Sequence, residues 1–351
     1  MPRVIGIDPG TVTLDVCGLA GGRVYLDASW PIAEALADPD GFIARLTAAG
    51  RPDLVVGPSG YGLPLCRAAD TDEGDLRLAF LAAPGDPGGI GGLRGFARRL
   101  GAAGLPVLYT PGVVHLDTVP AHRKINRVDL GTADKVCTAA LAIHQRRERS
   151  GQPLEVISLI LLELGGAFTA GLAIRDGRIV DGIGGSSGPI GWQACGALDA
   201  EVAFLAGTID KGMLFAGGVA TVAAADHSGS AAALEAYVEG ALKAVRQLIV
   251  AVPEPDEILL SGRHAADPGL ADRVGLALAD VAPVRRLDGF AVTAKQGAQG
   301  AALLADGLAG GGSAELVNRL RIREASGTVL DHLHVITPAA ARRRLGLDAD
   351  R

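Results

Sequence analysis

The chain repeats itself once, without a gap, at an offset of 155 positions. This offset places residues 7–11, Ile-Asp-Pro-Gly-Thr, over residues 162–166, Leu-Glu-Leu-Gly-Gly, and the Gly-Arg-Val at 22–24 over the Gly-Arg-Ile at 177–179. Apolar residues also match through the segments between these blocks. An acid, a turn glycine and a Gly-Arg-apolar hairpin kept in one register predict a duplicated fold.

Each copy begins with an apolar run that ends in an acid and a glycine. In residues 4–11 the run Val-Ile-Gly-Ile predicts a buried strand, and Asp-Pro-Gly-Thr predicts a turn whose backbone amides can face a phosphate. We expect Asp8 to hold a hydrated Mg²⁺. The alternative is a pair of plain hairpin turns, with Asp8 capping its own loop. The amides expected to face phosphates come from both turns, at Gly10, Thr11, Gly165 and Gly166.

The length of 351 residues leaves room for two domains, because single cores rarely grow past about 250–300 residues. We place a first domain at residues 1–150, a second at 151–312 and a C-terminal appendage at 313–351, with a cleft between the two domains. The net charge of −6 and the lack of a dense Lys/Arg run argue against a nucleic-acid groove or an anionic membrane as the main partner.

The four cysteines are widely spaced and form no Cys-x-x-Cys pair, which favours reduced thiols in a cytoplasmic protein. Asp8 interrupts the N-terminal apolar run, so no signal peptide is expected. The most hydrophobic window, residues 156–174, approaches the length of a membrane span, but Glu163 and three glycines argue against one. No membrane partner is therefore expected.

Periodicity and turn residues predict an α/β chain. Thr132 is placed to cap a helix by accepting the amide of Asp134 or Lys135. The predicted strands include residues 3–7, 13–19, 23–26, 52–56, 105–109 and 257–260. The predicted helices include residues 132–147, 231–250, 268–279 and 293–308, and Gly/Pro-rich loops are expected at 57–64 and 182–191.

Five segments, in their order along the chain, resemble the nucleotide-binding superfamily of sugar kinases, acetate kinase, heat-shock chaperones and actin. The resemblance implies two repeated ribonuclease-H-like α/β domains, with ATP and Mg²⁺ bound in the cleft between them. The matching segments are phosphate loop 1 at 6–11, a connecting helix at 131–144, phosphate loop 2 at 163–169, an adenosine loop at 260–265 and a second connecting helix at 296–307.

The same resemblance implies roles for individual residues. Asp8 and Glu163 would be the metal ligands, and Gly262 would let the backbone approach the nucleotide while Arg263 stacks on the adenine. A rival adenosine loop is residues 215–219, which also contain a glycine pair. Glu163 departs from the superfamily, where an aspartate is usual, but its longer arm can still reach a metal through water.

A polar run at residues 124–135 holds two of the chain's five lysines beside one arginine and two aspartates. Cations and a carboxylate are what in-line phosphoryl transfer needs. A carboxylate acceptor requires no base, which gives the arginine more of the catalysis, whereas a hydroxyl acceptor would make Asp129 the base. The alternative is a solvated loop and helix cap joined by ion pairs. The catalytic candidates are Lys124, Arg127, Asp129 and Asp134.

This run, together with Ser-Gly-Tyr-Gly-Leu-Pro at residues 59–64, more narrowly resembles a family labelled predicted butyrate kinase, which implies phosphoryl transfer to a carboxylate. Two loops are expected to face the cleft and to bind the acceptor. The alternative for both loops is a structural turn. The acceptor candidates are Ser59, Gly60 and Tyr61 in the first loop, and Ser186 and Ser187 in the second.

These patterns together predict a Mg²⁺-dependent, ATP-binding phosphotransferase that acts on a small-molecule acceptor, with a short-chain carboxylic acid favoured. A sugar or polyol kinase is an alternative. So is a non-kinase ATP-dependent switch or scaffold of the same fold, and so is a degenerate member that binds no nucleotide. The sequence leaves the oligomeric state open and allows a homodimer.

Overall fold

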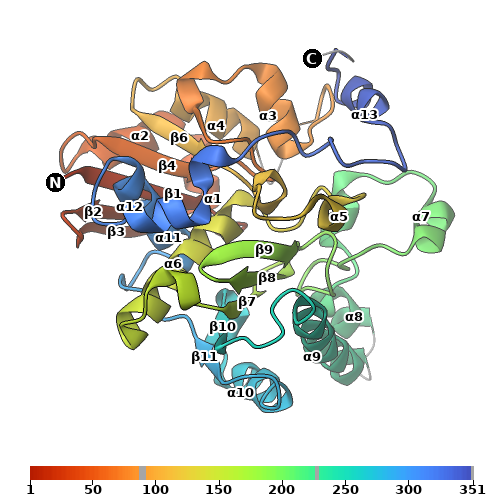
Figure 1. Ribbon diagram of the computed structural model, residues 1–351. Coiled ribbons are helices and arrows are strands. Elements are labelled where there is room, and N and C mark those ends of the chain that lie inside the picture. Colours follow the sequence, from red (N-terminus) through yellow and green to blue (C-terminus); the bar gives the residue numbers. More distant parts are fainter. Residues whose placement is uncertain (87–91, 226–228, 349–351) are drawn as a thin grey trace.

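Two β-sheets of matching strand order form the frame of the computed structural model, which describes residues 1–86, 92–225 and 229–348 (Figure 1). The first sheet has the order β3-β2-β1-β4-β6-β5, and the second has the order β11-β10-β7-β8-β9. In each sheet an antiparallel meander of three strands is extended by two parallel strands. The described residues therefore contain one topology twice, with β5 added at the edge of the first sheet.

The strands lie close to the ranges that the sequence predicts. Those of the first sheet are β1 (Arg3–Pro9), β2 (Thr13–Ala20), β3 (Arg23–Pro31), β4 (Leu54–Pro58), β5 (Cys66–Arg67) and β6 (Val107–Thr110). Those of the second sheet are β7 (Leu159–Leu164), β8 (Thr169–Arg175), β9 (Arg178–Ile183), β10 (Glu257–Ser261) and β11 (Val284–Arg286).

The helices lie between and after these groups of strands along the chain. In the first half they are α1 (Ile32–Ala37), α2 (Pro39–Thr47), α3 (Glu73–Phe80), α4 (Leu93–Gly101), α5 (Ala121–Lys124) and α6 (Ala133–Ser150). They continue with α7 (Ala200–Ala206), α8 (Val219–Ala225), α9 (Gly229–Leu248), α10 (Pro268–Ala277) and α11 (Gln296–Leu308), and end with α12 (Ala314–Leu320) and α13 (Pro338–Arg344).

The two meanders share a backbone irregularity at the predicted offset. The pairing of β2 with β3 shifts register between Gly18 and Leu19. The pairing of β8 with β9 shifts between Ala173 and Ile174, which are 155 positions further along the chain. Because such a bulge adds a residue to one strand and changes its twist, it is a specific feature of a sheet. The repeat in the sequence is therefore also a repeat in the backbone.

Both sheets are buried on both faces, because alternate residues of a strand point to opposite sides. In β1, Val4 joins one hydrophobic cluster and Ile5 joins another. In β7, Leu159 lies in the same cluster as Val4, whereas Ile160 belongs to a third cluster. The inner faces of the two sheets thus share one core, and each outer face has a core of its own.

Helices α6 and α11 fill the shared core between the sheets (Figure 1). Glycines allow their close approach, since a Cβ on Gly300 of α11 would collide with the backbone of Cys137 in α6. A Cβ on Gly6 of β1 would likewise collide with the backbone of α11 at Ala298 and Ala302. Helix α11 therefore follows the second sheet but packs on the first, and both expected connecting helices are present.

The start of α6 differs in one detail from the prediction. Thr132 is the N-cap residue, as expected, but its hydroxyl accepts no backbone amide. The hydroxyl instead donates to the carboxylate of Asp134. An acid two residues into the helix offers a charged acceptor, and this hydrogen bond is stronger than a bond to a backbone amide.

The C-terminal segment packs on the body of the protein. Leu316 and Leu320 of α12 belong to the core shared by the sheets, and Leu330 belongs to the core of the first half. The amides of His334 and Val335 donate to the Asn126 side chain, at 2.7 and 3.1 Å. The segment beyond residue 312 therefore holds the loop that precedes α6. The domain limits at residues 150 and 312 stay predictions.

The hydrophobic window at residues 156–174 forms strands rather than a helix. Most of it lies in β7 and β8, which pair with each other in antiparallel fashion. Within the described ranges, no helix combines the length and the apolar character that crossing a bilayer requires.

Candidate functional site

The two predicted phosphate turns face each other, and the predicted adenosine loop lies beside them. A Cβ built on Gly166 would lie 3.6 Å from Thr11 Oγ1 and 3.8 Å from Arg263 Cδ. Gly262 adopts a φ of +88°, and a Cβ there would lie 2.6 Å from the carbonyl oxygen of Leu164. The loops after β1, β7 and β10 therefore meet at one place, where only glycine permits the approach.

The turns themselves use two of the four amides that were expected to face phosphates. The Gly10 amide donates to the carbonyl of Thr13 at 2.8 Å, and the Gly165 amide donates to the carbonyl of Phe168 at 2.9 Å. These two bonds occupy equivalent positions in the repeat. The candidate phosphate donors therefore narrow to Thr11 and its counterpart in the second turn.

Asp8 lies at the end of β1 with 8% of its surface exposed. Its carboxylate faces the first turn of α11, since a Cβ on Gly297 would collide with Asp8 Oδ2. Burial, assisted by the neighbouring carboxylate of Asp134, raises the pKa of Asp8 to about 7, although Lys295 and Lys135 oppose this shift. The site thus holds a carboxylate with an incompletely balanced negative charge.

Lys135, in the first turn of α6, joins the two halves of the site. Its Nζ donates to Asp134 Oδ2 at 2.5 Å and to Glu163 Oε1 at 2.7 Å. Burial lowers the pKa of Lys135, but the two carboxylates outweigh burial and the net shift is upward. For Asp134 burial raises the pKa, yet Lys135 and the Thr132 hydroxyl more than offset it, so the net shift is downward.

A second lysine lies beside the first turn. Lys295 is the N-cap residue of α11, and its Nζ lies 3.1 Å from Asp15 Oδ2 and donates to the hydroxyl of Thr13. A Cβ on Gly10 would lie 3.0 Å from this Nζ. Lys295 and Asp15 are not among the site residues that the sequence predicts. The scarcity of lysine, with one of five lysines directly before a predicted connecting helix, was the available signal.

The donor set of this cluster suits a hard divalent cation. Four carboxylates meet two ammonium groups, and carboxylate oxygens are the ligands that Mg²⁺ prefers. Among the described residues, no group of three or more His, Cys, Asp or Glu side chains is placed to hold a metal ion. Since Mg²⁺ commonly binds through one or two carboxylates plus water and substrate phosphates, Asp8 is a sufficient protein ligand. The carboxylates are Asp8, Asp15, Asp134 and Glu163.

Of the predicted catalytic run, Asp134 enters this cluster and Lys124 does not. Lys124 is buried, and its Nζ donates to the carbonyl of Leu116 at 2.8 Å. Burial also lowers the pKa of Lys124. Arg127 is exposed on the loop before α6, and its guanidinium makes no hydrogen bond or ion pair with a described residue. The roles proposed for these residues stay predictions.

Asp129 joins the first half to the predicted acceptor loop of the second half. Its Oδ2 accepts both the amide and the hydroxyl of Ser186, at 3.0 and 2.9 Å, and its Oδ1 accepts the Gly131 amide at 3.1 Å. The hydroxyl of Ser187 donates to the Asp129 carbonyl at 2.6 Å. Asp129 is 4% exposed, and both of its carboxylate oxygens accept hydrogen bonds. The carboxylate therefore fixes the loop that carries Ser186.

The first predicted acceptor loop, residues 59–64, also lies near Asp129. Burial and the Asp129 charge raise the pKa of Tyr61, so Tyr61 lies near Asp129 and stays protonated. Lys211 Nζ lies 5.6 Å from the centre of the Tyr61 ring. Ser59 is buried and donates to the carbonyl of Thr110 at 3.1 Å, and its role in acceptor binding stays a prediction. The carbonyl of Gly60 accepts the amide of Ala133, the first residue of α6.

A separate cavity of about 780 Å³ lies elsewhere in the molecule. It is bounded by the tip of the first hairpin at Gly22, by His144 of α6, by Asp306 of α11 and by Leu316 of α12. No residue of the two phosphate turns lines it. The candidate site therefore lies outside this cavity.

A family model matches residues 6–335, and its description reads "Protein of unknown function (DUF1464)". The chain belongs to this family. The match includes both phosphate turns, both connecting helices and the C-terminal segment as far as Val335. No protein with curated annotation matches the sequence.

Solved structures similar to this family member include three kinases of small carboxylic acids. An acetate kinase from Entamoeba histolytica has a TM-score of 0.57 and 12% identity, with 79% of this chain and 86% of that chain covered. A propionate kinase from Francisella tularensis has a TM-score of 0.59 and 13% identity, with 86% of this chain and 99% of that chain covered. An acetate kinase from Porphyromonas gingivalis has a TM-score of 0.54 and 13% identity, with 80% of this chain and 88% of that chain covered.

At these sequence identities, the comparisons show that the chain shares the fold of these kinases. The predicted likeness in fold to acetate kinase is thereby confirmed. The family description names no activity, so the narrower resemblance to the family labelled predicted butyrate kinase stays a prediction.

Proposed function

We propose that this protein is a Mg²⁺- and ATP-dependent phosphotransferase that acts on a small acceptor, with a short-chain carboxylic acid favoured. The observation that carries the proposal is the meeting of the two acid-glycine turns around two lysines. Thr11 and Gly166 approach each other at the junction, and Lys135 and Lys295 bring two positive charges to it. Developing charge on a phosphoryl group is stabilised by such fixed cations.

Each part of the junction has a role in this proposal. The amides of Thr11 and Gly166 face the phosphates, and Arg263 stacks on the adenine. Asp8 would hold Mg²⁺, and the bound ion would supply positive charge that neutralises the phosphates. An acceptor oxygen forms a new bond to the γ-phosphorus while the bond to the ADP oxygen breaks, and Lys135 and Lys295 balance the charge that moves onto ADP.

The state of Asp129 favours a carboxylate acceptor. A hydroxyl acceptor needs a base, and Asp129 is occupied by three donor groups from Gly131 and Ser186. A carboxylate acceptor is already deprotonated at neutral pH and needs no base. The likeness in fold to acetate and propionate kinases supports the same choice. Tyr61 and the loop around Ser186 would then contact the organic part of the acceptor.

The test is acceptor-dependent release of ADP from Mg-ATP across a panel of acetate, propionate, butyrate, sugars and polyols. With a carboxylate acceptor, hydroxylamine should trap the acyl phosphate as a hydroxamate in step with ADP. ADP release with a sugar and no hydroxamate would overturn the carboxylate assignment. Tight ATP binding with no turnover across the panel would instead favour an ATP-dependent switch or scaffold.

A further inference from the structure

Glu163 stands where the superfamily resemblance leads one to expect aspartate, and the structure gives its longer arm a partner. The side chain extends from the end of β7 to the Nζ of Lys135, in the first turn of α6. Glycines leave room for this side chain, because a Cβ on Gly262 would lie 2.9 Å from Glu163 Cγ and a Cβ on Gly165 would lie 3.2 Å from Glu163 Oε1. Glu163 therefore spans the gap between the second sheet and the connecting helix.

The ammonium group of Lys135 contacts a carboxylate on each of two sides. Asp134 lies 2.5 Å away on its own helix and Glu163 lies 2.7 Å away across the site, and the lysine side chain is only 15% exposed. Asp134 also receives the Thr132 hydroxyl. An ammonium group held between two carboxylates provides the positive charge that a bound cation would otherwise provide.

Asp8 differs from these two carboxylates. The carboxylate of Asp8 forms no hydrogen bond or ion pair with another described residue. It nevertheless lies close enough to Asp134, Lys135 and Lys295 to interact with their charges. A buried carboxylate without a direct partner is the part of this cluster that an added cation would stabilise most.

We propose that Lys135 is a fixed cation that occupies the place of a second divalent ion between Asp134 and Glu163, and that the cleft binds one divalent ion, at Asp8. Glu163 is then the anchor of Lys135 rather than a metal ligand. The inference rests on the proposed function, because it assigns the residues that manage charge in the same cleft. It also gives Glu163 a reason for its length, since an aspartate would be one methylene too short for this contact.

The experiment counts Mn²⁺ ions bound to the full-length, nucleotide-free chain, using the EPR signal of free Mn²⁺ in a titration. The parent should bind one ion, and Asp8→Asn should weaken this binding at least about tenfold. Lys135→Gln should gain one further Mn²⁺ equivalent, because it leaves Asp134 and Glu163 without a cation. Lys135→Arg should keep the parent stoichiometry.

The decisive variant is Glu163→Gln. If Glu163 only anchors Lys135, the parent stoichiometry is kept, whereas a loss of Mn²⁺ as large as that of Asp8→Asn would overturn the inference. Failure of Lys135→Gln to gain an ion, or failure of the parent to bind one, would overturn it as well. Lys243→Gln removes an exposed pair with Glu239 and is the matched control. Since no nucleotide or acceptor is present, lack of turnover would contradict the proposed function without changing these counts.

Thermal unfolding of each variant provides the check on folding. Lys135→Gln unpairs two partly buried carboxylates, so its melting temperature should fall without Mn²⁺ and recover when Mn²⁺ is added. A melting temperature that does not respond to Mn²⁺ in this variant would also contradict a second ion site.

Discussion

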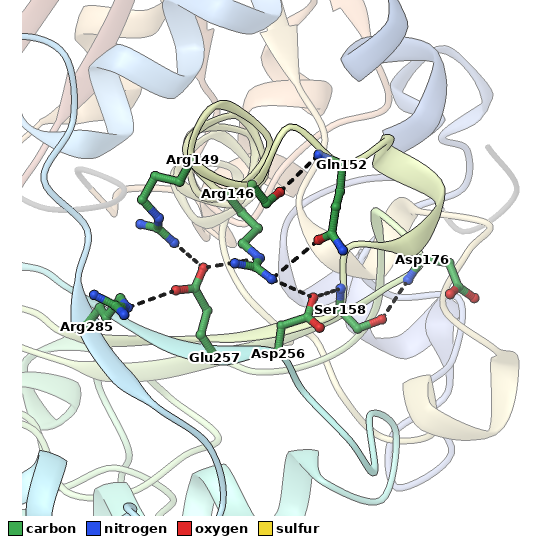
Figure 2. Close-up of polar contacts among 9 residues, drawn as sticks. Arg146, Arg149, Gln152, Ser158, Asp176, Asp256, Glu257 and Arg285 are labelled. Carbon is green, nitrogen blue, oxygen red and sulfur yellow. Dashed lines mark hydrogen bonds and ion pairs between the residues drawn. The ribbon is translucent and has the colours of Figure 1, made fainter.

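Two ion-pair clusters lie at opposite ends of the same strands, and they balance charge in opposite ways. β7 and β10 pair in parallel, with Leu159 opposite Glu257 at one end and Glu163 opposite Ser261 at the other. At the Glu257 end, arginines surround one buried carboxylate (Figure 2). At the Glu163 end, carboxylates outnumber the lysines.

The cluster at Glu257 contains more positive than negative charge. Arg149 donates to Glu257 Oε1, and the Nε atoms of Arg146 and Arg285 each lie 3.8 Å from its carboxylate oxygens (Figure 2). Glu257 is 2% exposed. This cluster fixes the last turns of α6 to the start of β10 and needs no further ion.

The cluster in the cleft has the opposite imbalance. Asp8 is left without a direct partner while two lysines serve the remaining carboxylates. A cluster with excess cations therefore stabilises the fold, and a cluster with excess carboxylates provides a place for an external cation. The comparison separates residues whose loss should cost stability from residues whose loss should cost function.

The largest expected effect is on stability, at Glu257. Glu257→Ala should lower the free energy of unfolding by about 3–5 kcal/mol, because Arg149 and Arg285 lose their carboxylate and Arg146 keeps only that of Asp256, at 3.8 Å. Chemical denaturation measures this loss. Under the proposed function, the fraction that remains folded should bind ATP as the parent does. A variant as stable as the parent would show that the arginine cluster does not stabilise the fold.

The next effect is on turnover, at Asp8. Asp8→Ala should reduce acceptor-dependent ADP release about 10²–10³-fold, since it removes the ligand of the ion that neutralises the phosphates. Its free energy of unfolding without Mg²⁺ should not fall, because the variant relieves an unbalanced buried charge. Unchanged turnover would place the metal, or the chemistry, elsewhere.

The free energy of unfolding, measured as a function of pH, tests the charge imbalance at Asp8 without a metal ion. The folded pKa of Asp8 is raised to about 7 from an ordinary value of 3.8, so the unfolded chain releases this proton first as the pH rises. The stability of the parent relative to Asp8→Asn should therefore fall between about pH 4 and pH 7, by on the order of 2–3 kcal/mol. Urea denaturation at several pH values measures the difference. A difference that stays constant with pH would mean that burial does not penalise the charged carboxylate.

The smallest expected effect is at the rim of the arginine cluster. Arg285 has a side chain that is 65% exposed and contacts Glu257 only at 3.8 Å. Arg285→Gln should change the free energy of unfolding by less than about 1 kcal/mol, because exposed ion pairs are screened by water. A loss as large as that of Glu257→Ala would show that all three arginines act as one unit.

The sequence predicted what local patterns and the repeat determine. The acid at the end of each first strand, the glycines after it and the two connecting helices all depend on short segments with clear periodicity. The sequence did not reveal the pairing of Lys135 with Glu163, because these residues meet only through the packing of α6 on β7 and β8. The same is true of Lys295, which reaches Asp15 from the other end of the chain.

The polar run at 124–135 shows a further limit of composition. It drew attention to the start of α6, but residue type alone did not distinguish Lys124, which is bonded to a backbone carbonyl, from Lys135, which contacts Glu163. The C-terminal segment gave no clear periodicity, and its contacts with Asn126 and His115 depend on distant parts of the chain.

The shared bulge, at Gly18 and Leu19 in the first half and at Ala173 and Ile174 in the second, has a consequence for comparing the two halves. An irregularity of the main chain involves no particular side chain, so it can persist while the side chains around it change. It is a match between the halves that does not depend on which side chains each half carries. Under the proposed charge assignment, the acid at the end of the first strand would serve an ion in one half, through Asp8, and a lysine in the other, through Glu163.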